Sequence, residues 1–147
     1  MKYLKITSPD IENGPGCRVT LWIPGCTHKC PGCHNAWTAD YNQGQEFDED
    51  AYNELKSILD KPYIRGLTIS GGDPMDQDDQ TLIDLIQLCF DISLEYPTKD
   101  IWLYTGYTWE QIFPTVCLDM FNVNNVYRKA TVEMCDVLVD GLYIEAE

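Results

Sequence analysis

Residues 66–105, GLTISGGDPMDQDDQTLIDLIQLCFDISLEYPTKDIWLYT, contain the pattern that decides the fold class. Short apolar runs at 66–70 and 101–105 are typical of strands that are covered on both faces. The segment between them has the apolar spacing of an amphipathic helix, at Leu82, Leu85, Ile86 and Cys89. A strand, a helix and a strand in this order predict parallel strands joined by a crossover helix.

The flanking sequence continues this alternation. Strand composition recurs at 17–24 and 136–140, and a helical pattern occupies 48–60. Asp48 is the expected N-cap of that helix, a shorter helix is expected to begin at Thr108, and residues 117–134 fit no single pattern. The sequence therefore predicts one α/β domain over 1–147, with a mainly parallel sheet and flanking helices. Periodicity leaves open whether the sheet curves toward a barrel.

Net charge and composition exclude several classes of partner. The 147 residues contain 10 Lys+Arg and 24 Asp+Glu, which gives a formal net charge of -14. Binding to nucleic acid or to an anionic membrane needs a basic face, so we expect neither. No apolar run approaches the roughly 18 residues of a spanning helix, and residues 1–16 lack the apolar core of a secretion signal. We therefore expect a soluble, cytoplasmic protein.

Polar and glycine-rich turns follow two of the expected parallel strands. Gly71-Gly72-Asp73 follows the first strand, and Thr105-Gly106 follows the second. Ligands of parallel α/β folds gather at the carboxyl ends of the strands. We therefore expect these two turns to face one site.

Three of the seven cysteines lie close together, in the spacing Cys26-x3-Cys30-x2-Cys33. Spacers this short bring three thiolates to one point, where a cation must offset their mutual repulsion. Soft thiolates favour zinc or an iron–sulfur cluster. Three thiolates leave one iron of a cluster open, whereas His28 or His34 can complete a closed zinc site, and the spacing alone allows both.

The other four cysteines are scattered along the chain. Cys89 lies on the apolar face of the predicted helix, and we interpret it as a small packing residue. Cys117 and Cys135 receive the same interpretation. The role of Cys17 is left open, because it follows the NGPG turn and is not far from the cysteine loop in sequence.

The cysteine spacing is also the signature of the radical S-adenosylmethionine (SAM) enzymes, which this chain resembles. Within that superfamily it resembles the activating proteins of anaerobic ribonucleoside-triphosphate reductase, including their PGC pattern at the third cysteine. The similar blocks follow the family's order and cover nearly the whole chain. They are DIENGPGCR (10–18), GCTHKCPGCHN (25–35), SGGDP (70–74), DIWLYTGYTWE (100–110) and VLVDG (137–141).

The resemblance implies a curved sheet like a partial (β/α) barrel and a [4Fe–4S] cluster on three catalytic cysteines, Cys26, Cys30 and Cys33. It also implies that SAM binds to the open iron and is cleaved reductively to a 5′-deoxyadenosyl radical. The expected SAM-binding residues are Gly32, Cys33, His34, Gly71, Gly72 and Asp73. Glycines suit this role because they let the backbone approach a ligand closely.

The implied partner is the anaerobic ribonucleoside-triphosphate reductase, which would receive a glycyl radical when the deoxyadenosyl radical removes a hydrogen from a glycine Cα. A one-electron reductant such as a flavodoxin is a second implied partner, and a homodimer is left open. Two alternatives remain, namely activation of a glycyl-radical enzyme of the pyruvate formate-lyase type and a non-catalytic zinc-binding interaction module. The family usually continues beyond its VDG strand into a tail with Arg-Gly-Ser and Asn-Gln segments. The sequence ends at Glu147, after GLYIEAE, so either this is a short member of the family or the tail is missing from this sequence, and the contacts of that tail are left open.

Overall fold

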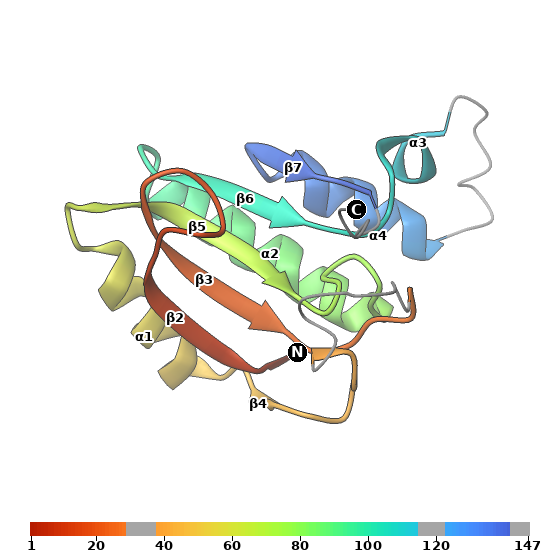
Figure 1. Cartoon of the computed structure of the whole chain (residues 1–147), viewed down its shortest axis with the longest axis horizontal. Coiled ribbons are helices and arrows are strands. Elements are labelled where there is room, and N and C mark those ends of the chain that lie inside the picture. Colours follow the sequence, from red (N-terminus) through yellow and green to blue (C-terminus); the bar gives the residue numbers. More distant parts are fainter. Residues whose placement is uncertain (29–37, 115–122, 142–147) are drawn as a thin grey trace, which may run out of the picture.

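The fold is seen in a computed structural model that describes residues 1–28, 38–114 and 123–141. The main sheet of these residues has five strands, in the order β2–β3–β5–β6–β7 (Figure 1). Their bounds are β2 Lys5–Asp10, β3 Cys17–Ile23, β5 Ile64–Gly71, β6 Asp100–Tyr104 and β7 Val137–Val139. A small sheet pairs β1 (Lys2–Tyr3) with β4 (Gln45–Glu46). The helices are α1 Glu49–Leu59, α2 Asp79–Glu95, α3 Trp109–Ile112 and α4 Val123–Glu133.

The main sheet is parallel except at one edge. Strands β3, β5, β6 and β7 pair in parallel in chain order, and β2 pairs antiparallel with β3. Crossover connections of one hand place their helices on one face, and α1, α2 and α4 all lie behind the sheet in Figure 1. The predicted α/β fold with a mainly parallel sheet and flanking helices is confirmed. Its curvature into a partial barrel stays a prediction.

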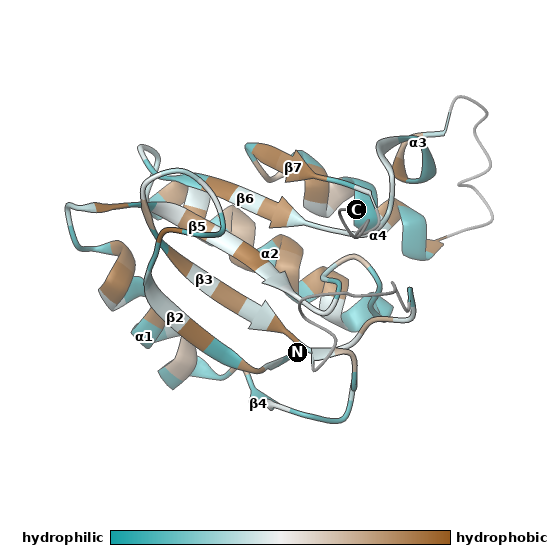
Figure 2. Cartoon of the chain, in the orientation of Figure 1, coloured by the Kyte–Doolittle hydropathy of each residue, from teal (hydrophilic) through white to brown (hydrophobic). Residues whose placement is uncertain are grey.

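The hydrophobic core lies between the sheet and these helices. Alternate strand residues point into it, and Figure 2 shows the resulting brown bands along β3, β5 and β6. The buried strand residues are Val19, Leu21, Ile23, Leu67, Ile69, Ile101 and Leu103, and they meet Leu55 and Leu59 of α1 and Leu82, Leu85 and Ile92 of α2. Burying each such side chain stabilises the fold by about 1.5–3 kcal/mol, so this face determines the register of the sheet.

The opposite face of the sheet carries the polar residues Arg18 and Thr68, and the segment between β2 and β3 contacts both of them. Arg18 of β3 is fully buried there, with its Nη1 atom 2.6 Å from Oδ1 of Asp100 at the start of β6. Its Nε donates to Oγ1 of Thr68 at 2.7 Å, and the Thr68 hydroxyl donates to the carbonyl of Asn13 at 2.7 Å. The charge of this buried arginine is therefore compensated by a partly buried ion pair with Asp100 of β6.

The beginnings of two helices agree with the sequence predictions. Asp48 is the N-cap of α1 and accepts from the Ala51 backbone N–H at 2.9 Å. Thr108 and Gln111 form a capping box at the start of α3. None of the helices in the described part of the chain is long and apolar enough to span a membrane.

Four features of the fold differ from the sequence predictions. The edge strand β2 and the small β1–β4 sheet are not predicted, and α4 lies in the stretch that fits no single pattern. Strand β5 also includes Gly71, so the first glycine of the expected turn still pairs with β3. The α4 sequence, VNNVYRKATVE, gives no apolar stripe, because two of its three buried residues, Asn125 and Thr131, are polar.

Candidate functional site

Backbone hydrogen bonds join the carboxyl ends of β3 and β5. The Gly72 N–H donates to the carbonyl of Ile23 at 2.8 Å, and the Asp73 N–H donates to the carbonyl of Gly25 at 2.7 Å. These bonds extend the parallel pairing of the two strands past their last residues. Cys26 therefore begins its loop directly beside the glycine turn of β5.

The two glycines of this turn are required by the neighbouring backbone. Gly71 has a φ of +123°, which side-chain-bearing residues rarely adopt. A Cβ atom on Gly72 would overlap the backbone of Gly25. The close approach of the chain after β3 thus explains the absence of side chains here, and the contact of Gly71 and Gly72 with SAM stays a prediction.

The two ends of the cysteine loop are paired with each other. The Gly25 N–H donates to the carbonyl of Thr38 at 2.7 Å, and the Cys26 N–H donates to the carbonyl of Ala39 at 3.1 Å. Residues 29–37 between these ends lie outside the described residues. The predicted site residues Cys30, Gly32, Cys33 and His34 belong to that segment, so their convergence with Cys26 stays a prediction.

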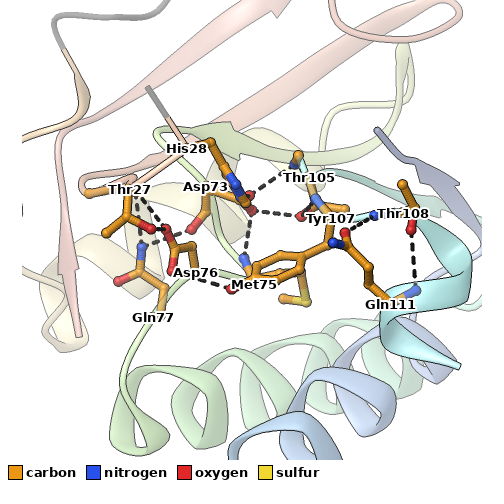
Figure 3. A network of polar contacts seen from close by, with 12 residues as sticks. Thr27, His28, Asp73, Met75, Asp76, Gln77, Thr105, Tyr107, Thr108 and Gln111 are labelled. Atoms are coloured by element: carbon orange, nitrogen blue, oxygen red, sulfur yellow. Dashed lines mark hydrogen bonds and ion pairs between the residues drawn. The ribbon is translucent and has the colours of Figure 1, made fainter. Parts of the chain in front are cut away.

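The buried carboxylate of Asp73 connects the turns after β5 and β6 (Figure 3). Its Oδ1 accepts from the Thr105 hydroxyl at 2.7 Å and from the Met75 N–H at 2.9 Å. Its Oδ2 accepts from the Gly106 N–H at 2.9 Å. The expected meeting of these two turns is therefore observed. Both carboxylate oxygens have protein donors, which assigns Asp73 a role in holding the turns together, while its contact with SAM stays a prediction.

His28 lies against the same carboxylate. Its Nε2 is 2.5 Å from Oδ2 of Asp73, and its ring makes an edge contact with Tyr107 at a centroid distance of 4.9 Å. The hydrogen bond to Asp73 raises the pKa of His28, although partial burial opposes this. The contact with Asp73 therefore favours the protonated imidazolium more than in a free histidine, and in that form both ring nitrogens are donors.

Asp76 holds the residue next to Cys26. Its Oδ2 accepts from both the backbone N–H of Thr27, at 2.7 Å, and the Thr27 hydroxyl, at 2.5 Å (Figure 3). Burial opposes ionisation of Asp76, but the hydrogen bonds from Thr27, together with Tyr41 and the nearby His28, outweigh it and lower the pKa of this carboxyl. The carboxylate of Asp76 is therefore the favoured form beside the cysteine loop.

Tyr107 and Arg128 connect this region to α4. Arg128 donates from Nε to the carbonyl of Met75 at 2.7 Å and from Nη2 to the Tyr107 hydroxyl at 3.1 Å. Its guanidinium also lies over the Tyr107 ring, 4.5 Å from the centroid. Sequence reasoning does not assign either residue to the site: Tyr107 lies in the family-like block at 100–110 without a role given to it, and Arg128 lies outside the similar blocks. Tyr107 does follow the Thr105-Gly106 turn, which is the one signal that points to it.

The remaining cysteines of the described residues lie away from this edge or in the core. Cys89 is buried in α2, as predicted. A hydrogen bond with Cys89, together with burial, raises the pKa of the Cys135 thiol, which fits a packing role. Cys17 lies at the amino end of β3, and the six further residues of the strand, about 20 Å, separate it from the end where the cysteine loop begins. Cys17 is therefore not part of the cysteine loop. Cys117 lies outside the described residues.

Three donor atoms near the loop could in principle hold a metal ion. The Cys26 thiol, a ring nitrogen of His28 and a carboxylate oxygen of Asp73 all lie within 4.8 Å of one another. However, His28 Nε2 and Asp73 are already paired, so binding a metal through both would break that contact. Of these three, Cys26 has the donor chemistry of a cluster ligand, and the sequence supplies the two further thiolates nearby.

Comparison with known proteins gives the family. Residues 12–147 match the family described as "4Fe-4S single cluster domain". The chain is also 40% identical over 144 residues to the anaerobic ribonucleoside-triphosphate reductase-activating protein of Enterobacteria phage T4, covering 97% of this chain and 81% of that protein. The chain belongs to this family of activating proteins. The same family name is carried by relatives from Escherichia coli (strain K12), 35% identical over 99% of this chain and 86% of theirs, and from Vibrio cholerae, 35% identical over 100% and 87%.

Membership of the activating-protein family bears on the cysteine loop. The match to a 4Fe–4S domain over residues 12–147, which include Cys26, Cys30 and Cys33, supports an iron–sulfur cluster rather than zinc in this chain. The names of the relatives state that those proteins activate anaerobic ribonucleoside-triphosphate reductase. The family match therefore supports an iron–sulfur cluster in a chain that belongs to a family of activating proteins.

Proposed function

We propose that this chain is a radical SAM enzyme that generates a glycyl radical on anaerobic ribonucleoside-triphosphate reductase. One observation supports the proposal most directly. Cys26 lies at the carboxyl edge of a parallel sheet, beside the glycine turn of β5. The relatives of this chain are activating proteins of that reductase. This is the edge at which parallel α/β enzymes bind their ligands.

In this proposal Cys26, Cys30 and Cys33 hold a [4Fe–4S] cluster and leave one iron open for SAM. When bound, the cluster supplies the electron that cleaves SAM into methionine and a 5′-deoxyadenosyl radical. The protein's own contribution is to bind and orient SAM. The Gly71-Gly72 backbone would hold the methionine part of SAM, with Gly32, Cys33, His34 and Asp73 as its further binding residues.

The substrate of the radical is a glycine of the reductase. Removal of one hydrogen from its Cα gives 5′-deoxyadenosine and leaves the stable glycyl radical on the partner. Residues 1–147 act as one activase domain, and the docked reductase closes one wall of the site and excludes water. A cytoplasmic one-electron reductant of the flavodoxin class supplies the electron, and the proposal is compatible with either a monomer or a homodimer.

Anaerobic reconstitution tests this function. The protein is incubated with iron, sulfide and reductant, and its iron and sulfide contents are measured before SAM is added. The proposal predicts about four irons per chain and reductant-dependent formation of 5′-deoxyadenosine and methionine. A colourless protein with stoichiometric zinc, or an intact cluster that never cleaves SAM, would contradict it.

A further inference from the structure

Both ends of the cysteine loop contact one residue of the β5–α2 connection. Thr27, next to Cys26, donates twice to the carboxylate of Asp76, and Tyr41, beyond the loop, donates from its hydroxyl to the backbone carbonyl of Asp76 at 2.8 Å. We propose that Asp76 is a positioning residue that fixes the geometry of the cysteine loop, and thereby of the first cluster ligand. The inference rests on the proposed function, because it takes Cys26 to be that ligand.

The carboxylate of Asp76 fixes the peptide group that joins Cys26 to Thr27. The Thr27 N–H belongs to that peptide group, and both Thr27 donors meet the same oxygen, Oδ2. The other oxygen, Oδ1, accepts from the Tyr107 hydroxyl at 3.4 Å. Because Thr27 and Tyr107 bind different oxygens of Asp76, the orientation of its carboxylate is fixed. The carboxylate in turn fixes the Cys26–Thr27 peptide group, and with it the direction of the Cys26 side chain.

Tyr41 holds the far end of the loop to the same point. Its ring lies so close to Gly25 that a Cβ atom there would overlap it. The Tyr41 ring therefore packs over the glycine that precedes Cys26, while the Tyr41 hydroxyl bonds to Asp76. Together with the Gly25–Thr38 and Cys26–Ala39 backbone bonds, these contacts close the base of the loop.

Asp76 can position the loop because it is itself held by buried structure. Its N–H donates to the carbonyl of Asp73 at 3.1 Å. On one side of it, Met75 is fully buried and its carbonyl accepts from Arg128 of α4. On the other side, the Gln77 amide donates to the carbonyl of Pro24 at 3.0 Å. Groups that orient ligands in this way are commonly needed for metal affinity and activity.

The experiment compares Asp76→Ala with Asp76→Asn, which keeps one acceptor oxygen for Thr27 but removes the charge. Asp78→Ala is the matched control, because Asp78 is a nearby carboxylate that caps α2 and is bonded to Thr81 rather than to the loop. The first readout needs no cluster. It is the rate at which iodoacetamide alkylates Cys26 in the cluster-free protein, followed by mass spectrometry of the Cys26 peptide.

We expect Asp76→Ala to change the Cys26 alkylation rate by about tenfold or more, the effect of losing roughly one net hydrogen bond to a charged group. Asp76→Asn should stay within about twofold of the original protein, and so should Asp78→Ala. Adding Thr27→Val to the Asp76→Ala variant should change the Cys26 alkylation rate little further, because both substitutions remove the same Thr27–Asp76 contact. Equal rates in the original protein and in a folded Asp76→Ala variant would overturn the inference, as would an Asn variant that behaves like the Ala variant.

The second readout uses the reconstituted protein. If Asp76 positions the first ligand, Asp76→Ala should alter the electron paramagnetic resonance spectrum of the reduced cluster, and Asp76→Asn should largely restore it. Identical spectra for the Ala variant and the original protein would contradict the inference. If the original protein binds no cluster, the proposed function fails by itself, whereas the alkylation experiment still decides the role of Asp76.

Discussion

Gly72 lies so close to Gly25 that a Cβ atom on Gly72 would overlap the Gly25 backbone. This contact joins the glycine turn after β5 to the residue that precedes Cys26. A glycine that sequence reasoning assigns to SAM binding thus has a structural requirement of its own. Any substitution at Gly72 therefore acts first on the cysteine loop.

Gly72→Ala should lower both stability and iron content. The added methyl group forces Gly25 to move, which we expect to reduce the free energy of unfolding by about 1–3 kcal/mol. Urea denaturation and iron analysis after reconstitution measure the two effects. Gly141→Ala is the control, because Gly141 has a φ of +92° but no atom near its Cβ position. That variant should lose only about 1 kcal/mol, from backbone strain, and keep its iron. Normal iron content in Gly72→Ala would contradict the assignment of this contact.

Removal of Arg18 should destabilise the fold far more than removal of Arg65. Both arginines approach Asp100, but Arg18 is fully buried at 2.6 Å, whereas Arg65 is 59% exposed at 3.5 Å. Breaking a buried ion pair costs about 3–5 kcal/mol, and an exposed pair contributes less than about 1 kcal/mol. Urea denaturation of Arg18→Ala and Arg65→Ala compares the two directly. A similar loss of unfolding free energy in the two variants would contradict the role of Arg18 in stabilising this face of the sheet.

The N-cap of α2 should make stability depend on acid pH. Hydrogen bonds from the side chain and backbone of Thr81 lower the pKa of Asp78. A carboxyl whose pKa is lower in the folded state contributes stability above its unfolded pKa, about 3.9, and loses that contribution as the pH falls through the folded value. Asp78→Ala should therefore cost about 1 kcal/mol at pH 7 and progressively less toward pH 3.

Urea denaturation of Asp78→Ala and Asp78→Asn at several pH values checks this. Asparagine is also a good N-cap, so the Asn variant should keep most of the stability at pH 7 without this acid dependence. A cost of Asp78→Ala that is the same at pH 7 and pH 3 would contradict the role of the ionised carboxylate.

Single Cys→Ala changes should separate cluster ligands from packing residues. Loss of Cys26, Cys30 or Cys33 should abolish the intact four-iron cluster and SAM cleavage, because each removes one thiolate ligand. Cys89→Ala should keep the cluster and lose only about 1 kcal/mol of stability, since it removes a small buried side chain. Iron analysis and 5′-deoxyadenosine formation distinguish the two classes. Normal cleavage in a variant without Cys30 would contradict the ligand assignment.

The regular elements of the fold are predictable because their patterns are local. The apolar runs of β5 and β6 and the periodicity of α2 depend on residues that are neighbours along the chain. Helix α4 is not predictable in this way. Its Val123 and Val126 are exposed, while Asn125 is buried and donates to the carbonyl of Ile112, so its polarity does not follow its burial.

The candidate site is predictable only where it belongs to a motif. Cys26, Gly72 and Asp73 are found from spacing and from the turn after a strand. Asp76 and Arg128 act through contacts between distant parts of the chain, and no local pattern marks them. Arg18 shows the same limit in the fold, because its partner Asp100 lies two strands away in the sheet.

The central claim is that this chain places a radical on a glycine of anaerobic ribonucleoside-triphosphate reductase. The most direct test mixes the reconstituted protein anaerobically with that reductase, reductant and SAM, and records the electron paramagnetic resonance spectrum. We predict a stable glycyl doublet on the reductase, which is absent when SAM is omitted and when Cys26→Ala replaces the original protein. If the cluster is intact and SAM is cleaved, yet no glycyl signal appears on the reductase, the claim is wrong.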